Sequence, residues 1–139
     1  MRSLPLLALF LLIGSHSFSQ SLEGEWKGSF ETAGTSTTTK ITLYFTQKKD
    51  SSYKIYSYTQ FKEYDGAWLT VVCHVACTRI SADSIYLEET KVAQPKDYRS
   101  PAFQKMSLAV RTRDGKRILE GVWKDTAGSE YGTIYFAKK

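Results

Sequence analysis

Eight short segments of the chain alternate apolar and polar residues, and this pattern restricts the possible fold more than any other feature. They lie near residues 26–30, 41–45, 53–62, 68–80, 85–87, 106–110, 119–123 and 134–136. A period of two is that of a β-strand, whose successive side chains point to opposite faces. Turn-forming pairs such as Asp65-Gly66 and Asp114-Gly115 separate the segments, as expected for hairpins. The sequence therefore predicts an all-β domain without helices.

Eight strands joined by hairpins can form either a sandwich of two sheets or one sheet closed on itself. Only one connection is long, from about Ala93 to Ala102, and it contains Pro95 and Pro101. Short connections favour the closed sheet, which needs no long crossovers and leaves no exposed strand edge. We therefore predict an eight-stranded antiparallel up-and-down β-barrel.

The first nineteen residues, MRSLPLLALFLLIGSHSFS, have the pattern of a secretory signal peptide. Arg2 precedes an apolar run from Leu4 to Ile13, and small residues, Ser17 and Ser19, come just before Gln20. The run is shorter than the roughly 20 apolar residues that span a bilayer, so no membrane span is expected. The sequence predicts a signal peptide at 1–19 and one barrel domain at 20–139, exported to the periplasm or the extracellular space.

One six-residue phrase occurs twice, as LEGEWK at 22–27 and as LEGVWK at 119–124. The halves of the chain share nothing further, so two strands that meet the same packing need are preferred over gene duplication. In an up-and-down barrel the first and seventh strands run in the same direction. We therefore expect both phrases to begin strands at one end of the barrel. Gly24 and Gly121 would let strands bend or neighbours approach closely, and Trp26 and Trp123 would plug that end.

A Gly-x-Trp at the start of the first strand of such a barrel resembles the calycin superfamily of lipocalins, fatty-acid-binding proteins and avidins. The stretches LEGEWKGSF and RDGKRILEGVWKDTAGSEYGTIYFAKK look like small secreted lipocalin-like proteins of Gram-negative bacteria, particularly of the Bacteroidetes type. The resemblance implies a barrel, often with an internal cavity, but no shared reaction. It also implies a basic residue against the Trp26 indole, for which Lys138 and Lys139 are candidates. Gly28 stands about where avidins use an asparagine for biotin, so biotin binding is not expected.

Aromatic residues are concentrated in KIYSYTQFKEYDGAW, residues 54–68. An eight-stranded barrel is either filled by side chains or just wide enough for one small ligand. We therefore expect an interior site for a small apolar or aromatic molecule, with these candidate contacts: Tyr44, Tyr56, Tyr58, Phe61, Trp68 and Tyr86. The period of two places Tyr56 and Tyr58 on one side of their strand and Ser57, Thr59 and Phe61 on the other, without indicating which side faces inward. If the tyrosines face outward, the alternative is a filled barrel that binds a protein, such as a periplasmic inhibitor or a surface accessory protein.

The residues that could perform catalysis or bind metal do not form a recognisable site. After signal cleavage His74 is the only histidine, and the alternation points it away from Cys73 and Cys77. Two cysteines four residues apart on one strand are too distant to form a disulfide, so two free thiols are expected unless a bulge brings them together. Glu88 and Glu89 face opposite sides, and whichever points inward needs a partner. No enzyme, cofactor or metal site is expected.

The charge of the chain does not indicate a nucleic-acid partner. Without residues 1–19 there are 18 Lys and Arg against 14 Asp and Glu, a net charge of +4. The densest basic group brackets a turn and consists of Arg111, Arg113, Lys116 and Arg117. It is expected to decorate one hairpin rather than follow a phosphate backbone.

Overall fold

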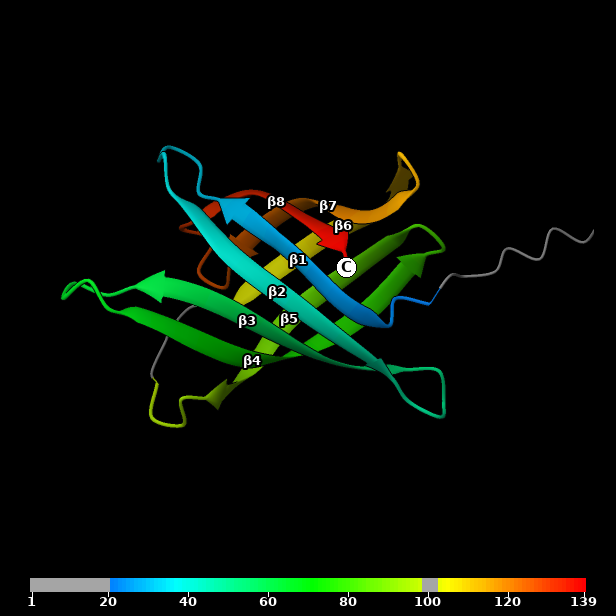
Figure 1. The fold of residues 1–139 in the computed structure, drawn as a ribbon, viewed down its shortest axis with the longest axis horizontal. Coiled ribbons are helices and arrows are strands. Elements are labelled where there is room, and N and C mark those ends of the chain that lie inside the picture. Colours follow the sequence, from blue (N-terminus) through cyan, green and yellow to red (C-terminus); the bar gives the residue numbers. More distant parts are fainter. Residues whose placement is uncertain (1–20, 99–102) are drawn as a thin grey trace, which may run out of the picture.

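A computed structural model describes residues 21–98 and 103–139 and shows one closed barrel of eight strands (Figure 1). Each strand pairs antiparallel with its sequence neighbours, and β8 closes the barrel on β1. The strands are β1 (Gly24–Glu31), β2 (Thr38–Gln47), β3 (Tyr53–Lys62), β4 (Trp68–Ser81), β5 (Ser84–Gln94), β6 (Gln104–Arg113), β7 (Lys116–Asp125) and β8 (Tyr131–Lys138). The predicted fold and connectivity are confirmed. The predicted signal peptide lies outside the described residues.

The connections alternate between the two ends of the barrel (Figure 1). We call the end at which β1 begins end A and the end at which β1 finishes end B. The Asp114-Gly115 turn lies at end A with both residues at positive φ, 52° and 75°, so the basic group brackets the β6–β7 hairpin as predicted. The long connection between β5 and β6 lies at end B. Among the described residues, no helix is long and apolar enough to cross a membrane.

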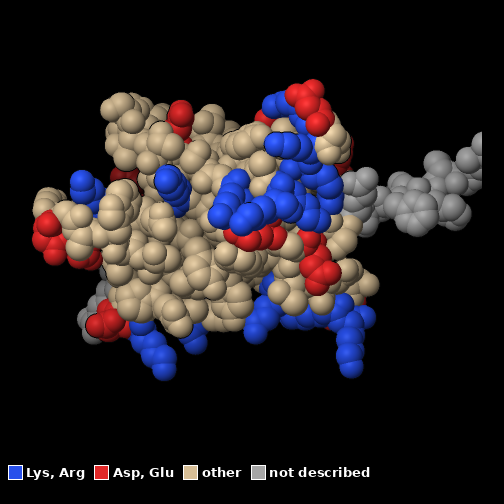
Figure 2. Space-filling view, in the orientation of Figure 1, with Lys and Arg blue, Asp and Glu red and all other residues tan. Residues whose placement is uncertain are grey.

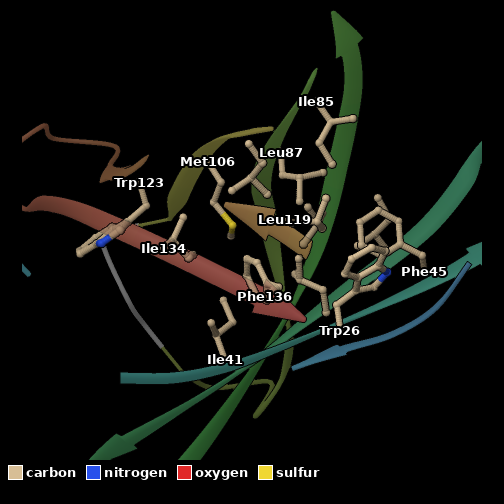
Figure 3. Close-up of a cluster of buried hydrophobic side chains, with 14 of the residues drawn as sticks. Trp26, Ile41, Phe45, Ile85, Leu87, Met106, Leu119, Trp123, Ile134 and Phe136 are labelled. Atoms are coloured by element: carbon tan, nitrogen blue, oxygen red, sulfur yellow. The ribbon is translucent and has the colours of Figure 1, made fainter. Parts of the chain in front are cut away.

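The inward side chains of all eight strands meet in one hydrophobic core (Figure 3). Burial alternates along the strands, so the period-two pattern of the sequence identifies the core positions. Fifteen strand residues form it: Trp26, Phe30, Ile41, Leu43, Phe45, Ile55, Val75, Ile85, Leu87, Met106, Leu108, Leu119, Trp123, Ile134 and Phe136.

Strand β4 is irregular, yet its two cysteines remain unpaired. Its pairing with β5 shifts register between Val72 and Cys73 and again between His74 and Val75. These bulges arise without a Gly, Pro or Asn in the stretch. Cys73 and Cys77 are nevertheless free, which confirms the prediction of two thiols and excludes the open alternative of a disulfide in this structure.

The two LEG-x-WK phrases do not occupy the same end of the barrel, and that prediction was wrong. Strands β1 and β7 do run in the same direction, because each is antiparallel to β8. Trp26, however, pairs with Lys138, whereas Trp123 pairs with Gly132, six residues away on β8. At about 3.3 Å per residue the two positions are roughly 20 Å apart. The phrase opens β1 but closes β7, so the indoles lie at opposite sides of the core (Figure 3).

The two glycines of the phrases also have different roles. Gly24 adopts a φ of +121°, which side chains rarely tolerate. Gly121 has an ordinary φ, but a Cβ there would lie 1.9 Å from the carbonyl oxygen of Ser107 on β6. The expected close approach of a neighbour is therefore confirmed at Gly121, where β6 and β7 lie too close together for any side chain.

Candidate functional site

End A of the barrel is closed by the Trp26 indole. Its Nε1–H donates to the Leu22 carbonyl at 2.8 Å, and its ring packs against Phe45 with centroids 6.4 Å apart. The Lys138 Nζ lies 5.8 Å and the Arg117 guanidinium 5.6 Å from the centroid of the indole ring. A basic residue of the last strand therefore covers this indole, as the lipocalin resemblance implied. The Trp26 indole is therefore fully buried beneath these neighbours at end A of the core.

The interior toward end B contains a polar cluster around one buried carboxylate. Glu89 faces inward from β5, and its Oε1 accepts a 2.6 Å hydrogen bond from the Ser57 hydroxyl. Its Oε2 accepts a bond from the Gln104 backbone N–H at 2.9 Å. Burial raises the pKa of Glu89, and these two bonds oppose the rise. Glu88 faces outward and pairs with Lys105 at 3.7 Å, so the prediction that an inward glutamate would need partners is confirmed at Glu89.

The space beside this cluster is too small for an apolar ligand. The cavity has a volume of about 20 Å³ and is bordered by Thr59, Phe61, Cys73, Glu89 and Gln104, among others. That volume matches a single water molecule, whereas drug-sized ligands need at least about 300 Å³. Burial, and then the neighbouring Glu89 carboxylate, raise the pKa of the Cys73 thiol to about 12, so the thiol is protonated. The chemistry available here is hydrogen bonding, not nucleophilic attack.

Two substitutions in this cluster should differ in their effect on stability, because the Ser57 hydroxyl has a hydrogen-bond partner and the Thr59 hydroxyl has none among the described residues. Ser57→Ala removes a donor to a buried carboxylate and is expected to lower the free energy of unfolding by about 1 to 3 kcal/mol. Thr59→Val keeps the shape and removes a buried Oγ1 that has no hydrogen-bond partner among the described residues, so it should cost less than about 0.5 kcal/mol or stabilise. Urea denaturation of both variants measures the difference. Equal losses would contradict this account of the cluster.

Most residues predicted to line an interior site lie outside the barrel. On β3 the buried positions are Ile55, Ser57 and Thr59, so Tyr56 and Tyr58 project outward. Tyr44 and Tyr86 project outward from β2 and β5 because their neighbours in the chain are the buried ones. Trp68, at the start of β4, is 69% exposed. Of the six candidates only Phe61 borders the interior cavity, and the interior placement of the other five was wrong.

Three of these tyrosines instead form a cluster on the outer surface. Tyr44, Tyr56 and His74 lie opposite one another on β2, β3 and β4. Tyr44 contacts Tyr58 edge to face at 4.9 Å between ring centroids, and Tyr56 packs against His74 at the same distance. We call Tyr44, Tyr56, Tyr58 and His74 the outer tyrosine face. His74 is thus packed against an aromatic ring, away from both cysteines.

The outer tyrosine face contains no Lys, Arg, Asp or Glu but has such residues beside it. Figure 2 shows that the surface over the middle of β2 and β3 is largely free of charged side chains. Lys54 Nζ lies 5.4 Å from the centroid of the Tyr56 ring. Glu25 lies opposite Tyr44 on β1, and partial burial, followed by this carboxylate, raises the pKa of Tyr44. A set of partly exposed aromatic rings with charged residues around it has the composition of a binding surface, whose contacts commonly come from Tyr.

Sequence reasoning did not identify which glutamate faces inward or that Gln104 is its partner, although the alternation contained a signal for both positions. In β5 the inward series Ile85, Leu87 continues to Glu89, and in β6 the series begins at Gln104 before Met106. A polar residue in phase with apolar ones predicts a buried polar group. The pairing of the two across β5 and β6 had no signal, because the long connection between these strands hides their register.

No protein-family model matches the chain, and no curated protein matches it. The structure itself shows an eight-stranded antiparallel barrel, which is compatible with a lipocalin-like fold. The function must therefore be argued from the arrangement of side chains.

Proposed function

We propose that the chain is an exported, non-catalytic protein-interaction module of the small lipocalin-like barrels, secreted by a Gram-negative bacterium into the periplasm or the extracellular space. The single observation that carries this proposal is the division of aromatic side chains. Apolar side chains and a small buried polar cluster around Glu89 fill the interior, whereas Tyr44, Tyr56 and Tyr58 stand together on the outer surface. Export rests on the signal-peptide pattern of residues 1–19.

The outer tyrosine face suits a protein partner. Tyr44 and Tyr58 are 39% and 37% exposed, so each ring already has one side supported by the barrel and loses little entropy on binding. Tyrosines in such positions often carry a large share of interface energy. The face is built on three strands that pair with one another within the closed barrel and is therefore rigid, which limits the cost of ordering it on association.

The proposal is tested with a matched pair of double variants of the 20–139 chain. Y44A/Y58A removes two rings of the face, whereas Y64A/Y135A removes two exposed tyrosines elsewhere. A partner captured from the exported proteins of the source organism, then purified, should bind Y44A/Y58A at least tenfold more weakly in titration, since two hot-spot rings commonly exceed 1.4 kcal/mol. Both doubles should keep the thermal midpoint of the unaltered chain within a few degrees.

Native mass spectrometry of the chain purified from that organism provides the contrary outcome. A small molecule that co-purifies and is lost in Y44A/Y58A would overturn the interaction proposal. The protein would then be expected to bind a small ligand rather than a protein partner.

A further inference from the structure

A second apolar surface lies on the outer side of β5 to β8, away from the outer tyrosine face. It is a groove of about 500 Å³, within the range of ordinary ligand pockets. Val122 forms part of it and is 57% exposed, because its neighbours in β7, Gly121 and Trp123, face inward and strand side chains alternate. An apolar residue left open in a groove of this size marks a potential binding site.

The register of four strands explains the shape of the groove. Ser107, Val122 and Thr133 lie side by side on β6, β7 and β8 and form a low floor. Tyr86 stands opposite Ser107 on β5, and Tyr131 precedes Thr133 by two residues on the same face of β8. Two large rings therefore flank three short side chains. The groove over these short side chains leaves room for a flat, apolar group between the two rings.

The row of residues beside the floor supplies a positive charge. Lys105 and Lys124 are opposite each other on β6 and β7, and both border the groove. Lys105 is paired with Glu88 at 3.7 Å. No carboxylate of the described residues forms an ion pair with Lys124, whose charge is therefore left for a ligand. An ammonium beside an apolar slot complements an anionic group on an apolar body.

We propose that this groove binds a small, flat aromatic monoanion, such as an aromatic carboxylate. The ring lies on Val122 between Tyr86 and Tyr131, and the carboxylate accepts a hydrogen bond from the Lys124 ammonium. Aromatic contacts with the two tyrosines add to the burial of Val122. This site is independent of the outer tyrosine face, so either can fail without the other.

The test uses the 20–139 chain and two probes with the same ring system, 2-naphthoate and neutral 2-naphthylmethanol. Backbone amide NMR titration gives both the dissociation constant and the location. We expect shifts concentrated at Val122, Lys124 and Thr133, and binding of naphthoate at least tenfold tighter than that of the alcohol. Shifts concentrated on β2 to β4 instead, or equal affinity for both probes, would overturn the proposal.

Two variants with matched controls separate the charge from the apolar floor. Lys124→Gln should weaken naphthoate about tenfold and leave the alcohol unchanged, whereas Lys49→Gln, an exposed lysine in the β2–β3 turn, should change neither. Val122→Glu should weaken both probes at least tenfold, while Thr46→Glu, on the outer surface of β2, should not. Far-ultraviolet circular dichroism checks that all four variants fold. If Lys124→Gln and Lys49→Gln have the same effect, Lys124 does not recognise the anion and the proposal is wrong.

Discussion

Trp26→Ala is expected to lower the free energy of unfolding by about 3 to 5 kcal/mol, as is typical when a large buried aromatic side chain is removed. The indole is fully buried, packs on Phe45 and donates its N–H to the Leu22 carbonyl. The variant loses this packing and leaves the Leu22 carbonyl without its donor. A domain of this size has only ~5 to 15 kcal/mol of stability, so the thermal midpoint should fall sharply.

The chain contains its own control for this substitution. Trp68 is the same residue type at the start of β4 but is 69% exposed, so Trp68→Ala should change stability by less than about 1 kcal/mol. Urea denaturation is best followed by far-ultraviolet circular dichroism, because each variant has lost one of the three tryptophans that would report on unfolding by fluorescence. A loss below about 1 kcal/mol for Trp26→Ala would show that its indole does not plug the barrel.

Trp123→Ala should cost a similar 3 to 5 kcal/mol, because this indole is buried against Phe30 at 4.6 Å between ring centroids and donates to the Glu31 carbonyl.

The opposite positions of the two indoles can be tested with milder Trp→Phe changes that keep the double variant folded. Residues that share no contacts have additive effects within about 0.5 kcal/mol. A coupling above about 1 kcal/mol would indicate that the two rings interact.

Gly121→Ala is also expected to have a large effect, although it adds only one methyl group. The new Cβ would lie 1.9 Å from the Ser107 carbonyl oxygen, an atom of the β6 backbone that cannot rotate away. Strands β6 and β7 must separate locally, at a cost of about 3 kcal/mol, the upper range for overpacked sites. Thermal denaturation of the variant measures this cost.

Gly66→Ala is the control for Gly121→Ala, because it measures the cost of an unfavourable backbone conformation without a steric clash. Gly66 has a φ of +85° and no atom within 4 Å of a built Cβ, so its replacement should cost only the left-handed penalty of about 1 to 2 kcal/mol. If Gly121→Ala is no worse than Gly66→Ala, the close approach of β6 and β7 does not restrict this position.

The amino-acid sequence by itself determined the number of strands, the positions of their turns and most of the core. These properties depend on neighbours in the chain: a period of two assigns Ile41, Leu43 and Phe45 to one face whatever lies across from them. Closure into a barrel followed from the short connections. The need of an inward glutamate for a partner was equally a local inference, since burial of a lone carboxylate is costly in any fold.

Tertiary structure alone decided which face of β3 points inward, because both faces carry side chains that can be buried. Ile55, Ser57 and Thr59 face the core, since their positions coincide with Leu43 and Val75 on the neighbouring strands, and Tyr56 and Tyr58 are therefore outside. This choice separates an interior ligand site from an outer tyrosine face. Pairing with distant strands, not the composition of the segment, determines it.

Strand pairing also explains why the two LEG-x-WK phrases lie at opposite ends of the barrel. Two nearly identical sequences have nearly the same local conformational preferences. The position of each one along the barrel, however, depends on where its strand begins and on its register with β8. Trp26 is the third residue of β1, whereas Trp123 is near the end of β7. Local sequence thus determined that both indoles would be buried, and only long-range pairing decided that they close opposite ends of the barrel, because register is a property of two strands and not of one.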